Sequence, residues 1–325
     1  MAIVDFYLSQ YRYWTFEHFI DHVNEFKPEN TPACFWKMSD RTVKRIIVRN
    51  NFKSPQANKP QSVKDIHPVR YKRENLGELI QLDASIHDWL ETDSKITLHL
   101  AIDDATSAIL ATYFDKEETL WGYHNVFYQI LINYGIPNIF YTDKRTVFEY
   151  KSSKRDEDTF TQFSRACSEV GVKIITTSVA QAKGRVERSF RTHQSRLINE
   201  MCKAGIKTID AANESPVNYI KRHNAKFAKG IAKDKTVFRK RPRLDQINKL
   251  LSVQHNRTIL NGNVVSIGKK QYLPMKNDKI VKLLPNLKVT VIRTFDRQLL
   301  LFDRKEYYRL ECVSYVACHS TQTSR

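Results

Sequence analysis

Three carboxylates stand where their side chains could bind metal ions. Asp83 lies inside the apolar segment LIQLDAS, where a lone carboxylate is costly unless it is paired or bound to a cation. Asp143 ends the apolar segment IFYTD, and Glu187 falls in the first two turns of a helix predicted to start near Ala182. Carboxylate oxygens suit hard cations such as Mg²⁺ or Mn²⁺. Two such ions, roughly 3.5–4 Å apart, can activate the attacking oxygen and stabilise the leaving oxygen of a phosphodiester.

Each of these acids also has a purely structural explanation. Asp83 could cap a bulge, Asp143 could start a turn, and Glu187 could be a solvated helix residue in an i,i+4 ion pair with Arg191. Other acids of the same region are better explained by a turn after a strand or by the start of a helix, where acids favour the dipole: Asp103, Asp104, Asp156, Glu157 and Asp158.

The elements around the three acids predict an α/β fold. Strands are expected at residues 78–87, 96–103, 108–114, 139–142 and 173–176, and the first three could form an antiparallel meander. Helices are expected at residues 120–134 and 156–170 and from about 182 to beyond 201. A run of strands followed by alternating helices and strands predicts a mixed sheet with helices on its faces. This is the element order of the ribonuclease-H-like fold.

The helix that carries Glu187 has two stripes. Val186, Phe190, Leu197 and Met201 form an apolar stripe, and Glu187 lies on a neighbouring polar one. Long basic side chains beside a metal ligand would suit binding to a phosphate backbone. The candidates for this role are Lys183, Arg185, Arg188 and Arg191.

The first 54 residues read as helices. Apolar residues recur at helical spacing from Trp14 to Phe26, and Ser39 is a good N-cap for a second helix. In that helix Val43, Ile46 and Ile47 would face inward, whereas the outward face would carry Arg41, Lys44 and Arg45. The pattern fits the recognition helix of a helix-turn-helix and fits an ordinary amphipathic surface helix equally well.

The last third of the chain changes from basic helix to short strands. A cluster of four cations, Arg239, Lys240, Arg241 and Arg243, is a candidate backbone-binding tether. From about residue 257 to 312, short strands separated by Asn, Gly, Asp and Pro predict a small β-barrel.

Charge and composition restrict the partners. The net charge of +18 favours polyanions, with nucleic acid first and an anionic membrane second; a merely soluble basic protein is the plain alternative. The acids concentrate in the middle of the chain, between basic flanks. The sequence has no run of about 18 apolar residues and no signal pattern, and its five cysteines are scattered. We expect an intracellular protein with reduced thiols and no membrane partner.

The strings QLDAS, LHLAIDDATSAIL, GIPNIFYTDKRTVFEYK, DTFTQF and SVAQAKGRVERSFRTHQSRL closely resemble the integrase-core transposases of bacterial insertion sequences, in particular the group called ISNCY. The resemblance is strong over residues 75–205 and weaker in the flanks. It implies a DDE triad of Asp83, Asp143 and Glu187, the last preceded by Gly184 in a G-x-x-E pattern. The interval from Asp143 to Glu187 is longer than in retroviral-type cores, and the N-terminal helical region is short for this group.

The resemblance also implies an activity. Such enzymes bind Mg²⁺, recognise the inverted repeats of their element, and hydrolyse a phosphodiester to free a 3′-hydroxyl. That hydroxyl attacks target DNA without ATP, usually within a multimer assembled on paired DNA ends. We therefore expect a DDE transposase with two Mg²⁺ or Mn²⁺ ions, acting on double-stranded DNA as a homo-oligomer at the bacterial nucleoid in the cytoplasm. The alternatives are a catalytically silent DNA-binding regulator and a nuclease without strand transfer.

The expected organisation has five parts. A helical, helix-turn-helix-like region at 1–54 and a linker at 55–75 precede a ribonuclease-H-like integrase core at 76–205. A basic helical connector at 206–255 and a small β-barrel at 256–315 follow it.

Overall fold

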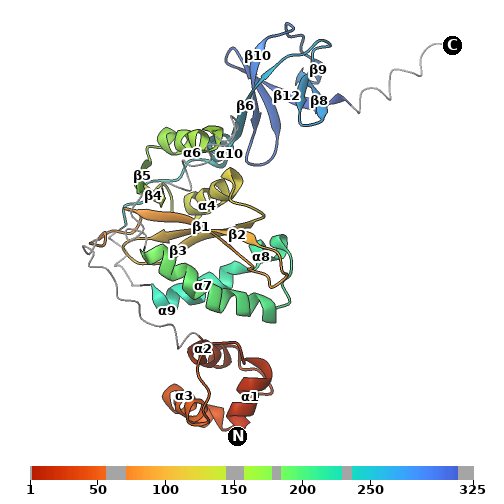
Figure 1. Cartoon of the computed structure of the whole chain (residues 1–325). Coiled ribbons are helices and arrows are strands. Elements are labelled where there is room, and N and C mark those ends of the chain that lie inside the picture. Colours follow the sequence, from red (N-terminus) through yellow and green to blue (C-terminus); the bar gives the residue numbers. More distant parts are fainter. Residues whose placement is uncertain (1, 56–70, 144–156, 178–183, 229–235, 314–325) are drawn as a thin grey trace, which may run out of the picture.

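The computed structural model describes residues 2–55, 71–143, 157–177, 184–228 and 236–313. Figure 1 shows N-terminal helices, a central sheet with helices on both faces, and a C-terminal antiparallel sheet in sequence order along the molecule. The predicted fold class is confirmed: a mixed α/β core stands between a helical unit and a barrel-like sheet. Within these described residues, no helix is both long and apolar enough to span a bilayer.

The central sheet has the strand order β3-β2-β1-β4-β5. Its first three strands are β1 (Ile80–His87), β2 (Ile96–Asp103) and β3 (Ile109–Asp115), joined as the predicted antiparallel meander. Two further strands, β4 (Ile139–Asp143) and β5 (Lys173–Thr177), are added parallel to β1. Three antiparallel strands extended by two parallel ones are the arrangement of a ribonuclease-H-like sheet.

Helices cover both faces of this sheet (Figure 1). One face packs against α4 (Leu120–Asn133) and α6 (Glu157–Glu169), with Phe127, Phe140 and Phe163 in one cluster. The other face packs against α7 (Gly184–Lys203), followed by α8 (Ile209–Glu214) and α9 (Pro216–Phe227). Every residue of β2 is buried, as expected for a strand that is covered on both faces.

The apolar stripe predicted on the long helix forms the contact between α7 and the sheet. Val186, Phe190, Leu197 and Met201 are all buried in the cluster that also contains Leu100 of β2. The prediction from helical spacing is therefore confirmed, because these four side chains point to the same side of the helix.

The acid pair at the end of β2 has a structural role, as predicted. Asp103 accepts hydrogen bonds from the Gly77 amide and from both the amide and the hydroxyl of Thr106, at 2.7–3.0 Å. Asp104 accepts from the Arg73 amide at 3.0 Å and from Gln81 Nε2 at 2.7 Å. Burial raises the pKa of Asp103. These contacts hold the turn between β2 and β3.

The N-terminal helices form a cluster of their own around Tyr11, Phe16 and Phe19. They are α1 (Ala2–Gln10), α2 (Phe16–Phe26) and α3 (Asp40–Arg49), with a short 3-10 helix at Phe35–Lys37. The Ser39 side chain caps α3 by accepting from the Thr42 amide, as predicted. The structure adds α1 and the 3-10 helix, which the sequence pattern had not revealed.

The described residues between α9 and the C-terminal sheet are only partly helical. Residues 236–243 contain no helix, and Arg239 pairs with Ile136 beside the central sheet through two backbone hydrogen bonds of 2.9 Å. The helix α10 (Leu244–Leu250) follows. The predicted linker falls largely on residues 56–70, outside the described residues.

The C-terminal sheet is antiparallel and nearly closed, with the path β6-β10-β11-β12-β8-β7 and β9 paired with β8. The strands are β6 (Val253–Thr258), β7 (Val265–Ile267), β8 (Lys270–Lys276), β9 (Lys279–Ile280), β10 (Lys288–Arg293), β11 (Leu299–Asp303) and β12 (Glu306–Cys312). The first of them thus begins at Val253, earlier in the chain than the expected start near Arg257.

Candidate functional site

Asp83 and Asp143 lie on neighbouring parallel strands at equivalent positions. The pairing of β1 with β4 runs through Gln81 opposite Tyr141, and each aspartate lies two residues further along its strand. Because side chains alternate with a period of two, both aspartates point to the same face as that pair. The backbone pairing of β1 with β4 ends at Gln81 and Tyr141, so the two aspartates lie just beyond the paired residues, on strands about 4.8 Å apart where they pair.

The face that carries the aspartates is the one covered by α7. Leu82 directly precedes Asp83, and Phe140 lies three residues before Asp143; both of these apolar residues belong to the cluster under α4 and α6. Asp83 and Asp143 therefore point to the opposite face. The cross-strand partner of Asp83 is Leu100, which lies in the cluster with α7.

Glu187 lies on the helix that covers this face. It is exposed, and its neighbour Val186 is fully buried in the same cluster as Leu100. Among the described side chains, however, no group of three or more His, Cys, Asp or Glu is placed to hold a metal ion. The structure thus brings the two aspartates onto one face and sets Glu187 on the covering helix, without gathering all three. Residues 144–156 and 178–183, which follow Asp143 and precede α7, lie outside the described part.

Both aspartates act electrostatically on Tyr123 of α4. The Tyr123 hydroxyl donates to Glu118 Oε1 at 2.5 Å. Burial raises the pKa of Tyr123 most, and the negative charges of Glu118, Asp83 and Asp143 raise it further. Tyr123 is therefore held as a protonated hydrogen-bond donor within the electrostatic range of the two aspartates. Sequence reasoning missed both Tyr123 and Glu118, because neither stands in a pattern that signals a site.

The basic candidates on α7 are only partly described. Arg188 and Arg191 are exposed on the helix. Lys183 and the side chain of Arg185 lie outside the described part. A ligand in solvent can therefore reach Arg188 and Arg191 on the same helix as Glu187.

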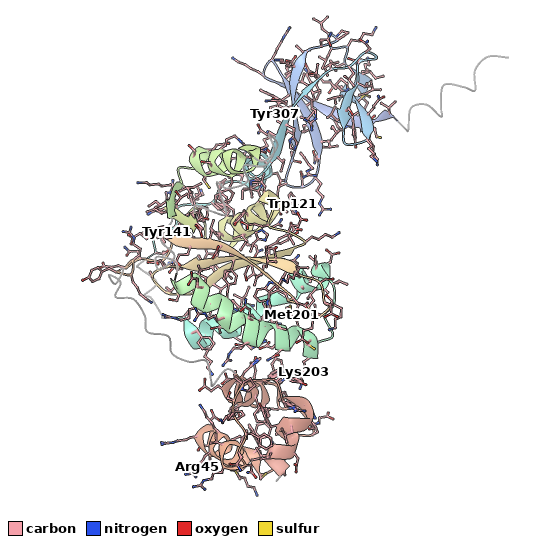
Figure 2. All side chains as sticks on the ribbon, in the orientation of Figure 1. Arg45, Trp121, Tyr141, Met201, Lys203 and Tyr307 are labelled. Carbon is pink, nitrogen blue, oxygen red and sulfur yellow. The ribbon has the colours of Figure 1, made fainter. Side chains whose placement is uncertain are left out.

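The candidates in the flanks have different surroundings. Arg41, Lys44 and Arg45 are exposed on α3, and Figure 2 shows Arg45 on the side of the helical unit that faces away from the central sheet. Lys44 pairs with Glu17 at 2.9 Å.

Near the central sheet, the Arg239 guanidinium donates to the carbonyls of Pro137 and Gly171 at 3.2 and 3.0 Å. Its neighbours Lys240 and Arg241 are exposed. Arg239 therefore fastens this segment to the core, and the next two cations remain open to solvent.

Comparison with known proteins identifies relatives. The chain is 37% identical over 297 residues to the transposase for insertion sequence IS1202 of Streptococcus pneumoniae, covering 82% of this chain and 63% of that protein. It is 37% identical over 164 residues to the putative transposase y4bF of Sinorhizobium fredii, covering 50% of this chain and 36% of the relative. The chain thus spans less than two thirds of the length of either relative. No protein-family model matches.

Solved structures that align with the chain include a viral integrase domain and a chain of a viral intasome structure. The catalytic core domain of HTLV-2 integrase in complex with magnesium aligns at 19% identity and a TM-score of 0.36, covering 50% of this chain and 95% of that one. A chain of the simian T-cell lymphotropic virus intasome aligns at 13% identity and a TM-score of 0.39, covering 85% and 92%.

Proposed function

We propose that this chain, a sequence relative of insertion-sequence transposases, is a DDE transposase that cleaves DNA and joins the freed strand to a target. The observation that carries the proposal is the equivalent placement of Asp83 and Asp143 on one face of adjacent parallel strands. Glu187 lies on the helix over that face. The relatives named as transposases support the same class of reaction.

The donor set fits hard divalent cations. All three candidates are carboxylates, which prefer Mg²⁺ or Mn²⁺ over softer metals. Asp83 and Asp143 would share one ion, and Glu187 would complete a second site. Two such ions supply charge stabilisation for the attacking and leaving oxygens of a phosphodiester.

Basic side chains would position the DNA. Arg188 and Arg191, with Lys183 and Arg185, would contact phosphates near the carboxylates, and Lys240 and Arg241 would extend the contact. Arg41, Lys44 and Arg45 of α3 would bind the inverted-repeat ends. Pairing of two ends would require a homo-oligomer on the DNA.

The direct test replaces Asp143 with asparagine. Asp143→Asn removes a metal-binding charge while keeping the side-chain shape, so we expect loss of Mg²⁺-dependent cleavage with DNA binding retained. Asp93→Asn is the matched control: it makes the same change at an exposed turn position with φ of 57°, which asparagine tolerates. Unchanged cleavage by Asp143→Asn would refute the assignment.

The products separate the alternatives. Joined products formed by 3′-hydroxyl attack indicate a transposase, and nicks alone indicate a nuclease without strand transfer. Binding without cleavage by the unmodified chain indicates a silent DNA-binding regulator.

A further inference from the structure

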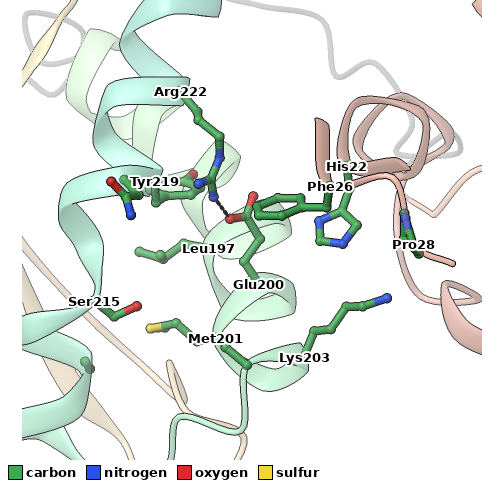
Figure 3. Close-up of a pocket in the computed structure, with 13 residues that line it drawn as sticks. His22, Phe26, Pro28, Leu197, Glu200, Met201, Lys203, Ser215, Tyr219 and Arg222 are labelled. Carbon is green, nitrogen blue, oxygen red and sulfur yellow. Dashed lines mark hydrogen bonds and ion pairs between the residues drawn. The ribbon is translucent and has the colours of Figure 1, made fainter. Parts of the chain in front are cut away.

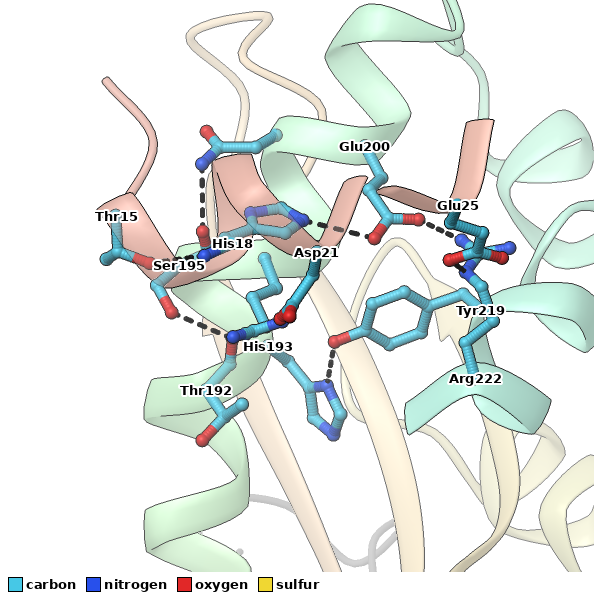
Figure 4. A network of polar contacts seen from close by, with 12 residues as sticks. Thr15, His18, Asp21, Glu25, Thr192, His193, Ser195, Glu200, Tyr219 and Arg222 are labelled. Carbon is cyan, nitrogen blue, oxygen red and sulfur yellow. Dashed lines mark hydrogen bonds and ion pairs between the residues drawn. The ribbon is translucent and has the colours of Figure 1, made fainter. Parts of the chain in front are cut away.

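The N-terminal helix α2 docks on α7 and α9 through ion pairs (Figure 4). Asp21 accepts from Arg196 Nη1 at 2.8 Å and also pairs with Lys226. Glu25 pairs with Arg222 at 3.2 Å. Two carboxylates of α2 thus engage three cations of the core.

The surface beneath α2 is basic. We call it the α7/α9 strip, and it consists of Arg196 and Lys203 on α7 and of Arg222 and Lys226 on α9. Glu200 is the carboxylate that lies among them, where it contacts His18 and Arg222. Burial lowers the pKa of both His18 and His22, in the latter case to about 4, so neither adds charge to α2 at neutral pH.

Aromatic rings of the N-terminal region also contact the strip. The Lys203 ammonium lies 3.7 Å from the centroid of the Tyr11 ring, and the Arg222 guanidinium lies 5.0 Å from that of Phe26. The cations of the strip are therefore contacted by carboxylates and aromatic faces, although Lys203 and Lys226 remain exposed. Nucleic acids offer basic proteins the same two kinds of group, as phosphates and as base faces.

Two pockets that open to solvent lie along the contact. Their volumes are about 450 and 500 Å³, and Figure 3 shows the first of them between Phe26 and His22 on one side and Leu197 and Glu200 on the other. The N-terminal helices also have their own buried cluster. Polar interfaces between separately packed units are the kind that can open.

We propose that the α7/α9 strip is a second nucleic-acid backbone site, which α2 partly covers in the unbound chain. Undocking of the N-terminal helices would uncover Arg196 and Arg222, whose side chains are 12% and 26% exposed, and would release Lys203 and Lys226, which are exposed already, from their contacts. The inference rests on the proposed action on DNA, and it adds a site whose four cations are all available to DNA only after α2 has left.

The test measures duplex DNA affinity without divalent metal, so that cleavage plays no part. In the full chain, Asp21→Asn with Glu25→Gln weakens the cover. We expect tighter binding and a steeper dependence of affinity on salt, by about 0.9 in the log–log slope for each added phosphate contact. Hydrogen exchange of α2 and α7 reports whether the contact has opened.

The control variant is Asp5→Asn with Glu29→Gln. It removes the same amount of charge as Asp21→Asn with Glu25→Gln, but from exposed positions of the N-terminal region. Adding Arg222→Gln and Lys226→Gln to the Asp21→Asn, Glu25→Gln variant should abolish its gain in DNA affinity. If Asp21→Asn with Glu25→Gln leaves the contact closed, Asp21→Lys with Glu25→Lys opens it by charge repulsion. The control for this second variant is Asp5→Lys with Glu29→Lys.

If hydrogen exchange shows that α2 has left α7 and α9, but DNA affinity does not rise above that of the control variant, the inference is wrong. It is also wrong if the variant forms a dimer without a gain in DNA affinity. If the unmodified chain binds DNA and the variants match it, only this inference fails. If the unmodified chain binds no DNA, the proposed function fails as well.

Discussion

Asp83 and Asp143 occupy equivalent positions on adjacent parallel strands, each two residues beyond the Gln81–Tyr141 pair. Neither local sequence predicts this match, because the register of β1 against β4 is set by the packing of the whole sheet. The match makes the two aspartates one unit, so replacing either should have the same effect on metal-dependent chemistry.

Glu187→Gln tests the third position of the proposed triad. If Glu187 completes a second ion site, Mn²⁺ titration by calorimetry should show fewer bound ions or a clear loss of affinity. Glu117→Gln, at an exposed position before α4, is the control. If both variants bind Mn²⁺ equally, Glu187 is not an ion ligand, and the proposed site consists of the two aspartates alone.

Gly122→Ala should destabilise the core by about 1–3 kcal/mol, as overpacking does. A methyl group on Gly122 would overlap the ring of His99 on β2, which is buried beneath α4. Urea unfolding measures the loss. Combining the change with His99→Ala should recover part of it, whereas simple additivity would show that the two sites do not interact.

His99 should make stability depend on pH. Its Nε2 accepts from the Thr119 amide and its Nδ1 lies 3.3 Å from the Tyr113 carbonyl, an arrangement that suits the neutral ring. Burial lowers its pKa to about 4, against the opposing effects of the Tyr113 carbonyl and Asp115. His99 therefore binds a proton more readily in the unfolded chain than in the folded one. Its contribution to the free energy of unfolding is complete above about pH 6.5 and is lost as the pH falls towards 4.

Unfolding in urea at pH 7.5 and pH 5 checks this sign. His99→Gln should reduce the fall in stability between the two pH values, by at most about 1.4 kcal/mol per pH unit. Other buried histidines act in the same direction, so part of the fall should remain. An unchanged fall would mean that His99 does not titrate in this range.

Phe295→Ala should loosen the C-terminal sheet from the core. The Phe295 ring stacks on Trp121 and Tyr128 of α4, with centroids 5.0 and 4.6 Å away. We expect a red shift of tryptophan fluorescence as Trp121 gains water, together with a larger radius in solution scattering. Phe302→Ala, which removes a ring that contacts Tyr307 within the C-terminal sheet, should leave Trp121 unchanged.

Local pattern determined much of the core. Alternation and helical spacing depend only on which side chains must be buried, and they predicted the meander, the apolar stripe of α7 and the Ser39 cap. The acids were singled out by their chemistry, by their places in the expected strands and helix, and by the family resemblance. The pattern missed α1 and the return of residues 236–243 to the sheet, where few local signals distinguish the actual structure.

Tertiary structure decided which faces meet. His18 contacts Glu200, and Asp21 contacts Arg196, across more than half of the chain. A sequence pattern states that a face is apolar or charged, but it does not state which distant face will cover it, because that choice depends on the packing of all the elements together. The shared face of Asp83 and Asp143, and the cover over the α7/α9 strip, are consequences of that packing.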